Sequence, residues 1–192
     1  ETVRVRVPMP GRGNLQNVLA GIAVARLFDV PLDAVAERAA SLRPAAHRGD
    51  VIRLAAGVTV VDDAYNSNPR ALEGALAVVA GERRFARRAA VLGEMRELGE
   101  SAVALHEACG RAAAASGLSL LVTVGGTPAR AMGRAAIEAG MPGARVWHAD
   151  TSVEAADIAA REVHAGDLVL VKGSRGVTTE RVVERLVSVF AG

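Results

Sequence analysis

Apolar residues recur in two different rhythms along the first part of the chain. Residues Val3–Val7 alternate strictly between apolar and polar, which is the pattern of a half-buried strand. Segment Leu15–Phe28 repeats apolar residues at the spacing of one helix face, and Asn14 stands where a helix N-cap is expected. A second, shorter helix is predicted over Leu32–Ala40. We expect these elements to form a short helical tail, not a complete domain.

After residue 50 the pattern changes to short apolar runs that alternate with helical segments. The predicted strands are Val51–Leu54, Val58–Asp62, Arg88–Leu92, Leu120–Val124, Arg145–His148 and Asp167–Val171. The predicted helices are Pro69–Ala80, Ser101–Ser116, Pro128–Ala139, Ser152–Val163 and Thr179–Phe190. Short, uniformly apolar strands that alternate with helices indicate a parallel sheet covered on both faces. We therefore expect a doubly wound α/β domain with a mostly parallel sheet.

Ligands of such sheets bind at the carboxyl ends of the strands, so the loops that follow the strands are the candidate sites. The first such loop contains two carboxylates, a phenol and two amides, namely Asp62, Asp63, Tyr65, Asn66 and Asn68. One interpretation is structural, because Asn68 before Pro69 is typical of a helix start and the acids can solvate a loop. The other is functional, because carboxylates accept from ribose hydroxyls or hold Mg²⁺ through water, and amides can read a base edge.

Three further loops of this kind are rich in glycine or charge. Segment Gly93–Gly99 has glycines at both ends, which permit a tight loop and the close approach of a ligand. Segment Gly125–Pro128 carries two glycines before a predicted helix, where a simple turn is one interpretation. Segment Lys172–Gly176 combines two cations, a hydroxyl and two glycines, which suits a carboxylate or phosphate ligand. For each of them a simple solvated turn remains an equal alternative.

Composition narrows the class of protein. A chain of 192 residues, 51% of them hydrophobic, makes one domain or one domain with a piece of another. Cys109 is the one cysteine, which excludes a disulfide framework. A net charge of +2 gives no strong case for nucleic acid or an anionic membrane as partner. We expect no membrane span, a cytoplasmic location and, because the chain starts at Glu1, a piece of a longer protein.

Several catalytic motifs are missing from the chain. It has no GxxxxGK[ST] phosphate loop. Its histidines, His47, His106, His148 and His164, lack metal-ligand spacing, so no metal site is predicted. His106 falls within a predicted helix, where we expect a surface or half-buried side chain. No Ser–His–Asp or Cys–His set can be assembled from the spacing. The pattern therefore predicts an α/β domain that binds a ligand but has no phosphate-binding loop of its own.

Five segments follow one another in the order GRGNLQN, AHRGD, VVDDAYNSNP, VLGEMRELG and LVKGSRG. This order resembles the carboxy-terminal portion of the Mur ligase family, most closely its MurF type, and DDAYNSNP is its most specific element. The resemblance covers essentially the whole chain. It implies that residues 1–46 are the tail of a central ATP-binding domain. Residues 47–192 would be the Rossmann-like, glutamate-ligase-type C-terminal domain, with the phosphate loop upstream of residue 1.

The resemblance also implies an activity in peptidoglycan precursor synthesis. Enzymes of this type move the γ-phosphate of ATP onto the carboxylate of UDP-N-acetylmuramoyl-tripeptide, and the amine of D-Ala-D-Ala then attacks the acyl phosphate. The implied partners are these two substrates and the upstream domains of the same enzyme. The implied cofactors are ATP and Mg²⁺, with the Mg²⁺ ligands in the upstream domain. The chain by itself is expected to be inactive.

Family roles at the nucleotide can be carried over position by position. Asn14 and Asn17 match amides that contact adenine, and Arg48 matches an arginine that reaches toward the ATP phosphates. Asp63 matches a carboxylate near the ribose. The other members of the same loop, expected beside the nucleotide, are Tyr65, Asn66 and Asn68. Many members of the family have His where this chain has Gly13, so a role of that His does not transfer.

Roles at the other substrates are implied for the last glycine-rich segment. Lys172, Ser174 and Arg175 match a loop that faces the peptide and the acceptor. Arg48 and Lys172 are the residues expected to serve catalysis. Two alternatives remain open: another amino-acid ligase of the Mur or folylpolyglutamate type, and a non-catalytic module that binds a nucleotide or peptide.

Overall fold

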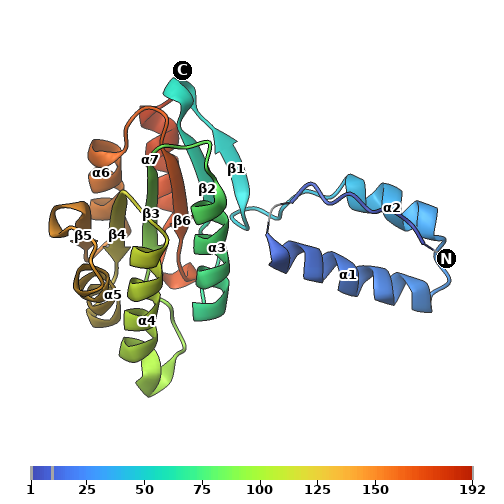
Figure 1. Ribbon diagram of the computed structural model, residues 1–192, viewed down its shortest axis with the longest axis horizontal. Coiled ribbons are helices and arrows are strands. Elements are labelled where there is room, and N and C mark those ends of the chain that lie inside the picture. Colours follow the sequence, from blue (N-terminus) through green and yellow to red (C-terminus); the bar gives the residue numbers. More distant parts are fainter. Residues whose placement is uncertain (1, 10, 192) are drawn as a thin grey trace. The chain divides into compact units, whose positions relative to one another are not determined.

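The computed structural model describes residues 2–9 and 11–191 (Figure 1). The chain divides into two compact units, Glu1–Ala45 and Ala46–Gly192, called here the N-terminal and the C-terminal unit. Each unit is described by itself. No helix in the described part of the chain is both long and apolar enough to cross a membrane.

The N-terminal unit consists of helix α1 (Arg12–Leu27) and helix α2 (Leu32–Ala40). Both helices were predicted, but the N-cap of α1 is Gly11 and not Asn14, which lies inside the first turn. Gly11 has a φ of 94°, which glycine adopts without steric cost, so the helix starts earlier than expected. The predicted strand Val3–Val7 is also wrong, because none of the described residues pairs with this segment as a strand.

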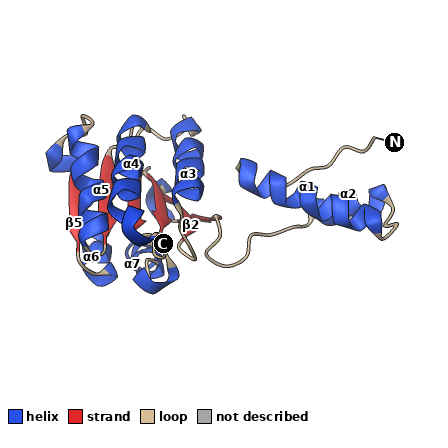
Figure 2. Ribbon diagram, turned by 90° about the horizontal axis from the view of Figure 1, so that it is seen from below, coloured by secondary structure: helices blue, strands red, loops and turns tan. Residues whose placement is uncertain are grey.

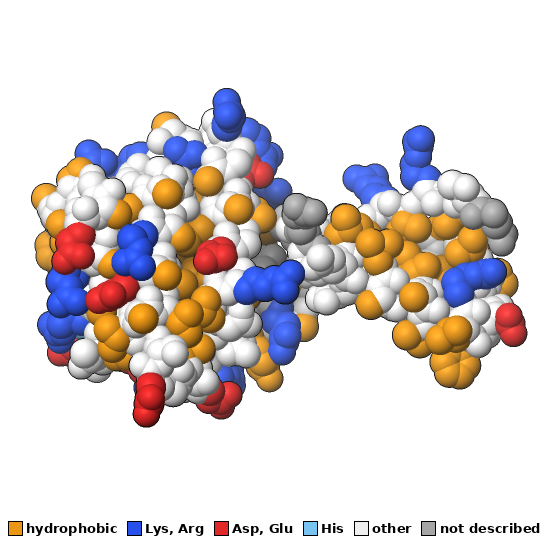
Figure 3. Space-filling model, turned by 60° about the horizontal axis from the view of Figure 1, so that its bottom comes forward, with side chains coloured by type: hydrophobic (Ala, Val, Ile, Leu, Met, Phe, Trp, Pro, Cys, Tyr) orange, Lys and Arg blue, Asp and Glu red, His pale blue; other side chains and the backbone are white. Residues whose placement is uncertain are grey.

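Helix α1 leaves much of its apolar face exposed. Its large side chains are exposed by 48% at Leu15, 56% at Leu19 and 82% at Leu27. Figure 3 shows hydrophobic side chains gathered on the surface of this unit. Within its described residues the buried apolar side chains are those of Val18, Val35 and Ala39. Burial of apolar surface is the main stabilising term of a fold, so this unit has little core of its own.

The C-terminal unit is built on one six-stranded sheet with the order β1-β2-β6-β3-β4-β5. The strands are β1 (Asp50–Arg53), β2 (Thr59–Asp63), β3 (Arg88–Gly93), β4 (Leu120–Val124), β5 (Val146–Ala149) and β6 (Leu168–Lys172). Strand β1 pairs antiparallel with β2, and every other pair is parallel. The carboxyl ends of β2, β6, β3, β4 and β5 therefore lie at one edge of the sheet.

Helices cover both faces of this sheet. They are α3 (Pro69–Gly81), α4 (Ala102–Ala115), α5 (Thr127–Glu138), α6 (Ser152–Glu162) and α7 (Glu180–Val189). Figure 2 shows α3, α4 and α5 on one side and α6 and α7 on the other. Two separate clusters of buried side chains correspond to these two layers, one around Leu72, Leu76 and Met132, the other around Ile158 and Leu186. The α/β, doubly wound and mostly parallel fold predicted for this part of the chain is confirmed.

The predicted bounds of the strands and helices in this unit agree with the structure to within one residue at each end. The small shifts have a consequence at the sheet edge. Strand β2 extends to Asp63 and β6 to Lys172, so both side chains belong to strand ends and their positions are set by the sheet register. The short segments Ala55–Gly57, Gly99–Ser101, Gly143–Arg145 and Arg175–Val177 are 3₁₀ turns.

Candidate functional site

A charged pair joins the carboxyl ends of the neighbouring strands β2 and β6. The sheet register places Asp63 directly opposite Lys172. The Lys172 ammonium donates to Asp63 Oδ2 at 2.6 Å and to the carbonyl oxygen of Asn66 at 2.9 Å. Lys172 is only 3% exposed, so its charge is compensated inside the protein rather than by water. This pair fixes the loop after β2 against the end of β6.

The preceding carboxylate points to the other face of the strand, as alternate residues of a strand do. Asp62 is buried, and its Oδ2 lies 2.8 Å from Nδ1 of His47. Its Oδ1 accepts from the backbone N–H of Ala64. Asp62 and Asp63 are thus directed to different partners. Among residues 2–9 and 11–191 no group of three or more His, Cys, Asp or Glu side chains could hold a metal ion.

Two guanidinium groups lie over one exposed phenol ring. Cζ of Arg48 is 4.2 Å from the ring centroid of Tyr65, and Cζ of Arg175 is 5.8 Å from it. The Tyr65 backbone N–H donates to the carbonyl of His47, which ties the ring's backbone to the residue before Arg48. Cations over an aromatic face are attracted by its quadrupole. The ring, 40% exposed, therefore presents two cations to solvent, an arrangement suited to an anionic ligand.

The two amides of the same loop each make a local contact. Asn68 Oδ1 accepts from the backbone N–H of Ala71 at 2.9 Å, so Asn68 is the N-cap of α3, as expected from its place before Pro69. Asn66 Oδ1 accepts from the N–H of Ser67 at 2.8 Å. These contacts shape the loop and hold the Asn66 carbonyl toward Lys172.

Ser174 connects the loop after β6 to the loop after β3. Its buried Oγ accepts from the backbone N–H of Arg96 at 3.0 Å. The strand ends can approach because Gly93 and Gly173 lack side chains. A Cβ on Gly93 would lie 2.8 Å, and one on Gly173 2.7 Å, from atoms of Thr179. Gly93 and Gly173 are therefore required by packing at this edge.

His106 was expected at the surface or half-buried, and this is wrong, because it is fully buried. It shares one stripe of α4 with the buried residues Cys109, Gly110 and Ala113, and helical periodicity could have identified this stripe. Nδ1 of His106 lies 2.6 Å from the Ala102 carbonyl, and Nε2 accepts from the N–H of Met95 at 2.9 Å. Burial lowers the pKa of the imidazole below its ordinary value of 6.5.

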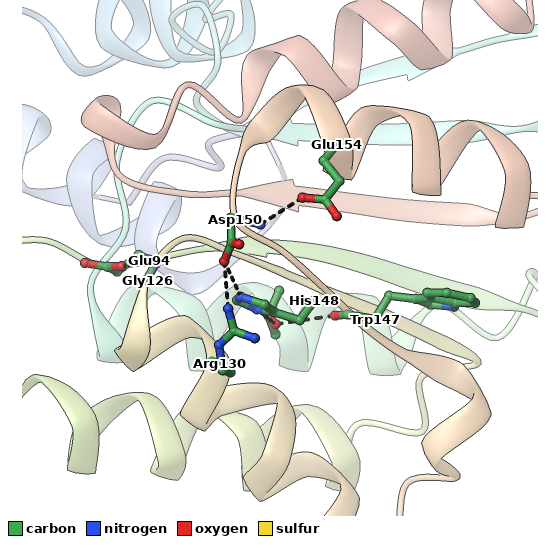
Figure 4. A network of polar contacts seen from close by, with 8 residues as sticks. Glu94, Gly126, Arg130, Trp147, His148, Asp150 and Glu154 are labelled. Atoms are coloured by element: carbon green, nitrogen blue, oxygen red, sulfur yellow. Dashed lines mark hydrogen bonds and ion pairs between the residues drawn. The ribbon is translucent and has the colours of Figure 1, made fainter.

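A second polar network lies at the ends of β4 and β5 (Figure 4). Asp150 Oδ1 accepts from Nη2 of Arg130 at 2.8 Å and lies 3.2 Å from Nε2 of His148. Nδ1 of His148 is 3.0 Å from Oγ1 of Thr123, and the Asp150 N–H donates to Glu154. Sequence reasoning missed this network because its members come from three separate segments. Strand β3 lies between it and the Lys172–Asp63 pair.

His148 and Glu154 of this network also line a groove of about 660 Å³, together with Trp147 of β5, Arg161 of α6 and Thr151 between the two elements. Cζ of Arg161 lies 4.9 Å from the Trp147 ring centroid. The groove contains none of the expected site residues. The carboxyl ends of β2, β3 and β6 are the stronger candidate site, because the buried charges of Asp62 and Lys172 lie there and hydrogen bonds connect the loops that follow these strands.

The structure brings the expected residues together in part. Arg48, Asp63, Tyr65, Lys172 and Arg175 are linked by the contacts above. Ser174 joins them through the loop after β6, and Asn66 and Asn68 through the loop after β2. Asn14 and Asn17 lie on α1 of the N-terminal unit, so the C-terminal unit does not contain them.

Comparison with known sequences identifies relatives along nearly the whole chain. A family model described as "Mur ligase, glutamate ligase domain" matches residues 47–175. The UDP-N-acetylmuramoyl-tripeptide–D-alanyl-D-alanine ligase of Mycobacterium tuberculosis is 37% identical, over 96% of this chain and 39% of its own length. The ligase of the same name from Bacillus subtilis is 26% identical over 94% of this chain and 39% of its own. The chain thus spans about two fifths of the length of these relatives.

Solved structures agree with this. The MurF ligase from Thermotoga maritima, solved in complex with ADP, has a TM-score of 0.76 and 29% identity, covering 95% of this chain and 39% of its own. A MurF structure from Acinetobacter baumannii has a TM-score of 0.84 and 27% identity, covering 96% and 40%. By these matches in sequence and structure, the chain belongs to the Mur ligase family and contains its carboxy-terminal, glutamate ligase domain.

Proposed function

We propose that the chain is the carboxy-terminal part of an ATP-dependent ligase that joins D-Ala-D-Ala to UDP-N-acetylmuramoyl-tripeptide. The observation that carries the proposal is the 37% identity to a ligase of that name over 96% of the chain. This match includes both units. The reaction would proceed through an acyl phosphate on the tripeptide carboxylate, and the enzyme would work in the cytoplasm in peptidoglycan precursor synthesis.

The nucleotide would lie against the loop after β2. The Arg48 guanidinium lies over the exposed Tyr65 ring, and the Tyr65 N–H donates to the carbonyl of His47, the residue before Arg48, so the guanidinium is oriented before an anion arrives. Phosphoryl transfer depends on charge neutralisation and alignment more than on covalent chemistry by the protein. We assign Arg48 to the ATP phosphates and the Asp63 loop, with Tyr65, Asn66 and Asn68, to the nucleoside. Asn14 and Asn17 would contact adenine from the N-terminal unit.

ATP would supply the phosphoryl group that activates the carboxylate. The cations around Tyr65 fit an anionic cofactor of this kind. The described residues offer no cluster that fits a metal ion, so the proposed Mg²⁺ ligands lie in the upstream domain.

Lys172, Ser174 and Arg175 would form the side of the site that faces the peptide and the acceptor. Arg175 is exposed and near Tyr65, which suits a carboxylate ligand. Lys172 already donates to Asp63 and Asn66, so direct contact with a substrate requires its ammonium to leave Asp63. If its ammonium stays on Asp63, Lys172 serves to hold the loop after β2 against the end of β6.

The N-terminal unit would be the tail of the central ATP-binding domain. The exposed apolar side chains of α1 support this, because a helix with such a face is stable when further protein covers it. The upstream domains of the same enzyme are the proposed cover. The domain boundary would lie after residue 46, next to the division of the chain into its two units.

The isolated chain should bind ATP weakly and turn none over, because it contains no phosphate loop. This is checked by assaying phosphate release from ATP by the purified 192-residue chain. Measurable turnover that copurifies with the chain would contradict the proposed division of labour between the domains.

The function itself is tested on the full-length parent. Phosphate release is measured with ATP, Mg²⁺ and UDP-N-acetylmuramoyl-tripeptide, with D-Ala-D-Ala or single amino acids as acceptor. Release that depends on the dipeptide supports the proposal. Release with a different acceptor would assign another amino-acid ligase of the same family. No release with any acceptor would favour a non-catalytic module that binds a nucleotide or peptide.

A further inference from the structure

Three consecutive residues after β3 are each tied to a different part of the C-terminal unit. Glu94 Oε2 accepts from the N–H of Gly126, in the loop after β4, at 2.7 Å. The next residue, Met95, donates its N–H to His106 on α4. The third, Arg96, donates its N–H to Ser174 Oγ, in the loop after β6. The contact of Met95 lies between the two that reach neighbouring strand ends, and the backbone N–H of Glu94 also donates to the Val124 carbonyl at 2.8 Å.

The partners of His106 define its tautomer. The Ala102 carbonyl can only accept a hydrogen bond, so Nδ1 carries the proton and donates to it at 2.6 Å. The Met95 N–H can only donate, so Nε2 is unprotonated and accepts at 2.9 Å. An imidazolium would place an N–H against the N–H of Met95. The contact therefore requires the neutral ring.

The surroundings of His106 favour this neutral form. The side chain is fully buried on the face of α4 that packs into the core, and burial penalises the charged ring. The hydrogen bond to the Ala102 carbonyl, together with the weaker influence of the Glu94 carboxylate at the end of β3, has the opposite effect and favours the charged ring. Burial outweighs this effect, so the direction of the pKa shift agrees with the hydrogen-bond geometry.

We propose that His106 is a positioning residue, whose neutral imidazole holds the loop after β3 so that Arg96 meets Ser174 after β6 and Glu94 meets Gly126 after β4. That this edge is where substrate binds rests on the proposed function. The hydrogen-bond role of His106 does not, because it concerns contacts within the chain. His106 touches no reacting group and would act through Met95.

The first test uses the 192-residue chain and three variants. His106→Gln keeps an acceptor near the place of Nε2 and cannot titrate near neutral pH. His106→Leu keeps a buried side chain without an acceptor. His164→Gln is the matched control, because His164 is exposed and precedes β6 at the opposite edge of the sheet. Hydrogen exchange of the Met95 and Arg96 amides is measured by NMR relative to the core amides of β3 and β4.

In His106→Leu, we expect the Met95 and Arg96 amides to exchange roughly tenfold faster relative to the core, with protection largely retained in His106→Gln and in the control. Unchanged protection in His106→Leu would overturn the proposal. If His106→Leu does not fold, the proposal is tested on the imidazole ring of the wild-type chain instead. Its ¹⁵N shifts should report a proton on Nδ1 and none on Nε2 at neutral pH, and a proton on Nε2 would overturn the proposal.

The second test uses the full-length parent and separates the two proposals. His106→Gln should retain kcat/KM within about threefold at neutral pH, whereas His106→Leu should lose roughly tenfold, mainly in kcat. Wild-type activity should fall at acid pH through a step that His106→Gln lacks. A parent without ligase activity would refute the proposed function and leave the hydrogen-exchange result to decide on His106. Equal activities and pH profiles in an active parent and both variants would refute the effect on the site.

Discussion

The ammonium of Lys172 lies 2.6 Å from Oδ2 of Asp63, although the two residues are 109 positions apart in the sequence. They meet because β2 and β6 are parallel neighbours whose register places these positions opposite each other. The Lys172 side chain is almost fully buried and that of Asp63 is partly exposed. Removing one partner of such a pair leaves a charge with incomplete compensation.

Replacing Lys172 with Met should therefore lower the free energy of unfolding of the chain by about 1–3 kcal/mol, less than for a fully buried pair because water reaches Asp63. Asp63→Asn in the same background should recover part of this loss. Urea unfolding of the two single variants and the double variant measures the coupling. Arg84→Met serves as the control, because the Arg84–Glu82 pair is largely exposed and should contribute less than about 0.5 kcal/mol. Equal losses in Lys172→Met and the control would refute this account of the pair.

The stacking of Arg48 on Tyr65 predicts a graded effect on the use of ATP by the parent ligase. Arg48→Ala should lower kcat/KM for ATP roughly tenfold or more, because a cation for the phosphates is lost. Tyr65→Phe keeps the ring face and should stay within about twofold, whereas Tyr65→Ala should lose about fivefold. Steady-state kinetics at varied ATP checks this, with exposed Arg83→Ala as control. An Arg48→Ala enzyme with wild-type kinetics would remove Arg48 from the nucleotide site.

Two glycines inside helices should respond in opposite ways to alanine. A Cβ on Gly110 of α4 would collide with the backbone carbonyl of Met132 on α5, so Gly110→Ala should lower the free energy of unfolding by about 2 kcal/mol or more. Gly74 of α3 has nothing within 4 Å of such a Cβ, and alanine there should raise stability by about 0.5–1 kcal/mol. Thermal unfolding of the two variants provides the comparison. A stable Gly110→Ala protein would show that α4 and α5 can move apart at low cost.

The buried imidazole of His106 predicts a pH dependence of stability. Its pKa in the folded chain lies below its ordinary value of 6.5, so the unfolded chain binds this proton more readily. The stability due to the neutral ring is complete above that ordinary value and is lost as the pH falls toward the folded pKa. Urea unfolding between about pH 7.5 and pH 5 should show a steeper loss in the wild type than in His106→Gln. Parallel curves would contradict the assignment.

The strands and helices of the C-terminal unit could be predicted to within one residue because their signals are local. Short β-branched runs bounded by glycine, and apolar spacing that matches one helix face, depend only on neighbouring residues. Alternating strands and helices also restrict the topology, because a right-handed crossover is the rule between parallel strands. The same local signals place the glycine-rich and polar segments at the strand ends, where the structure has them.

The sequence by itself thus determined the class of fold, the edge of the sheet that carries the polar groups and the residue types found there. The tertiary structure decided which of those residues meet. In the folded chain Asp62 contacts His47, and Asp63 contacts Lys172. His106 is buried and accepts a hydrogen bond from the Met95 N–H. Segment Val3–Val7 has no partner strand among the described residues. Such contacts depend on strand order and register between distant segments, and a local pattern contains no information about the partner that a side chain will find across the sheet.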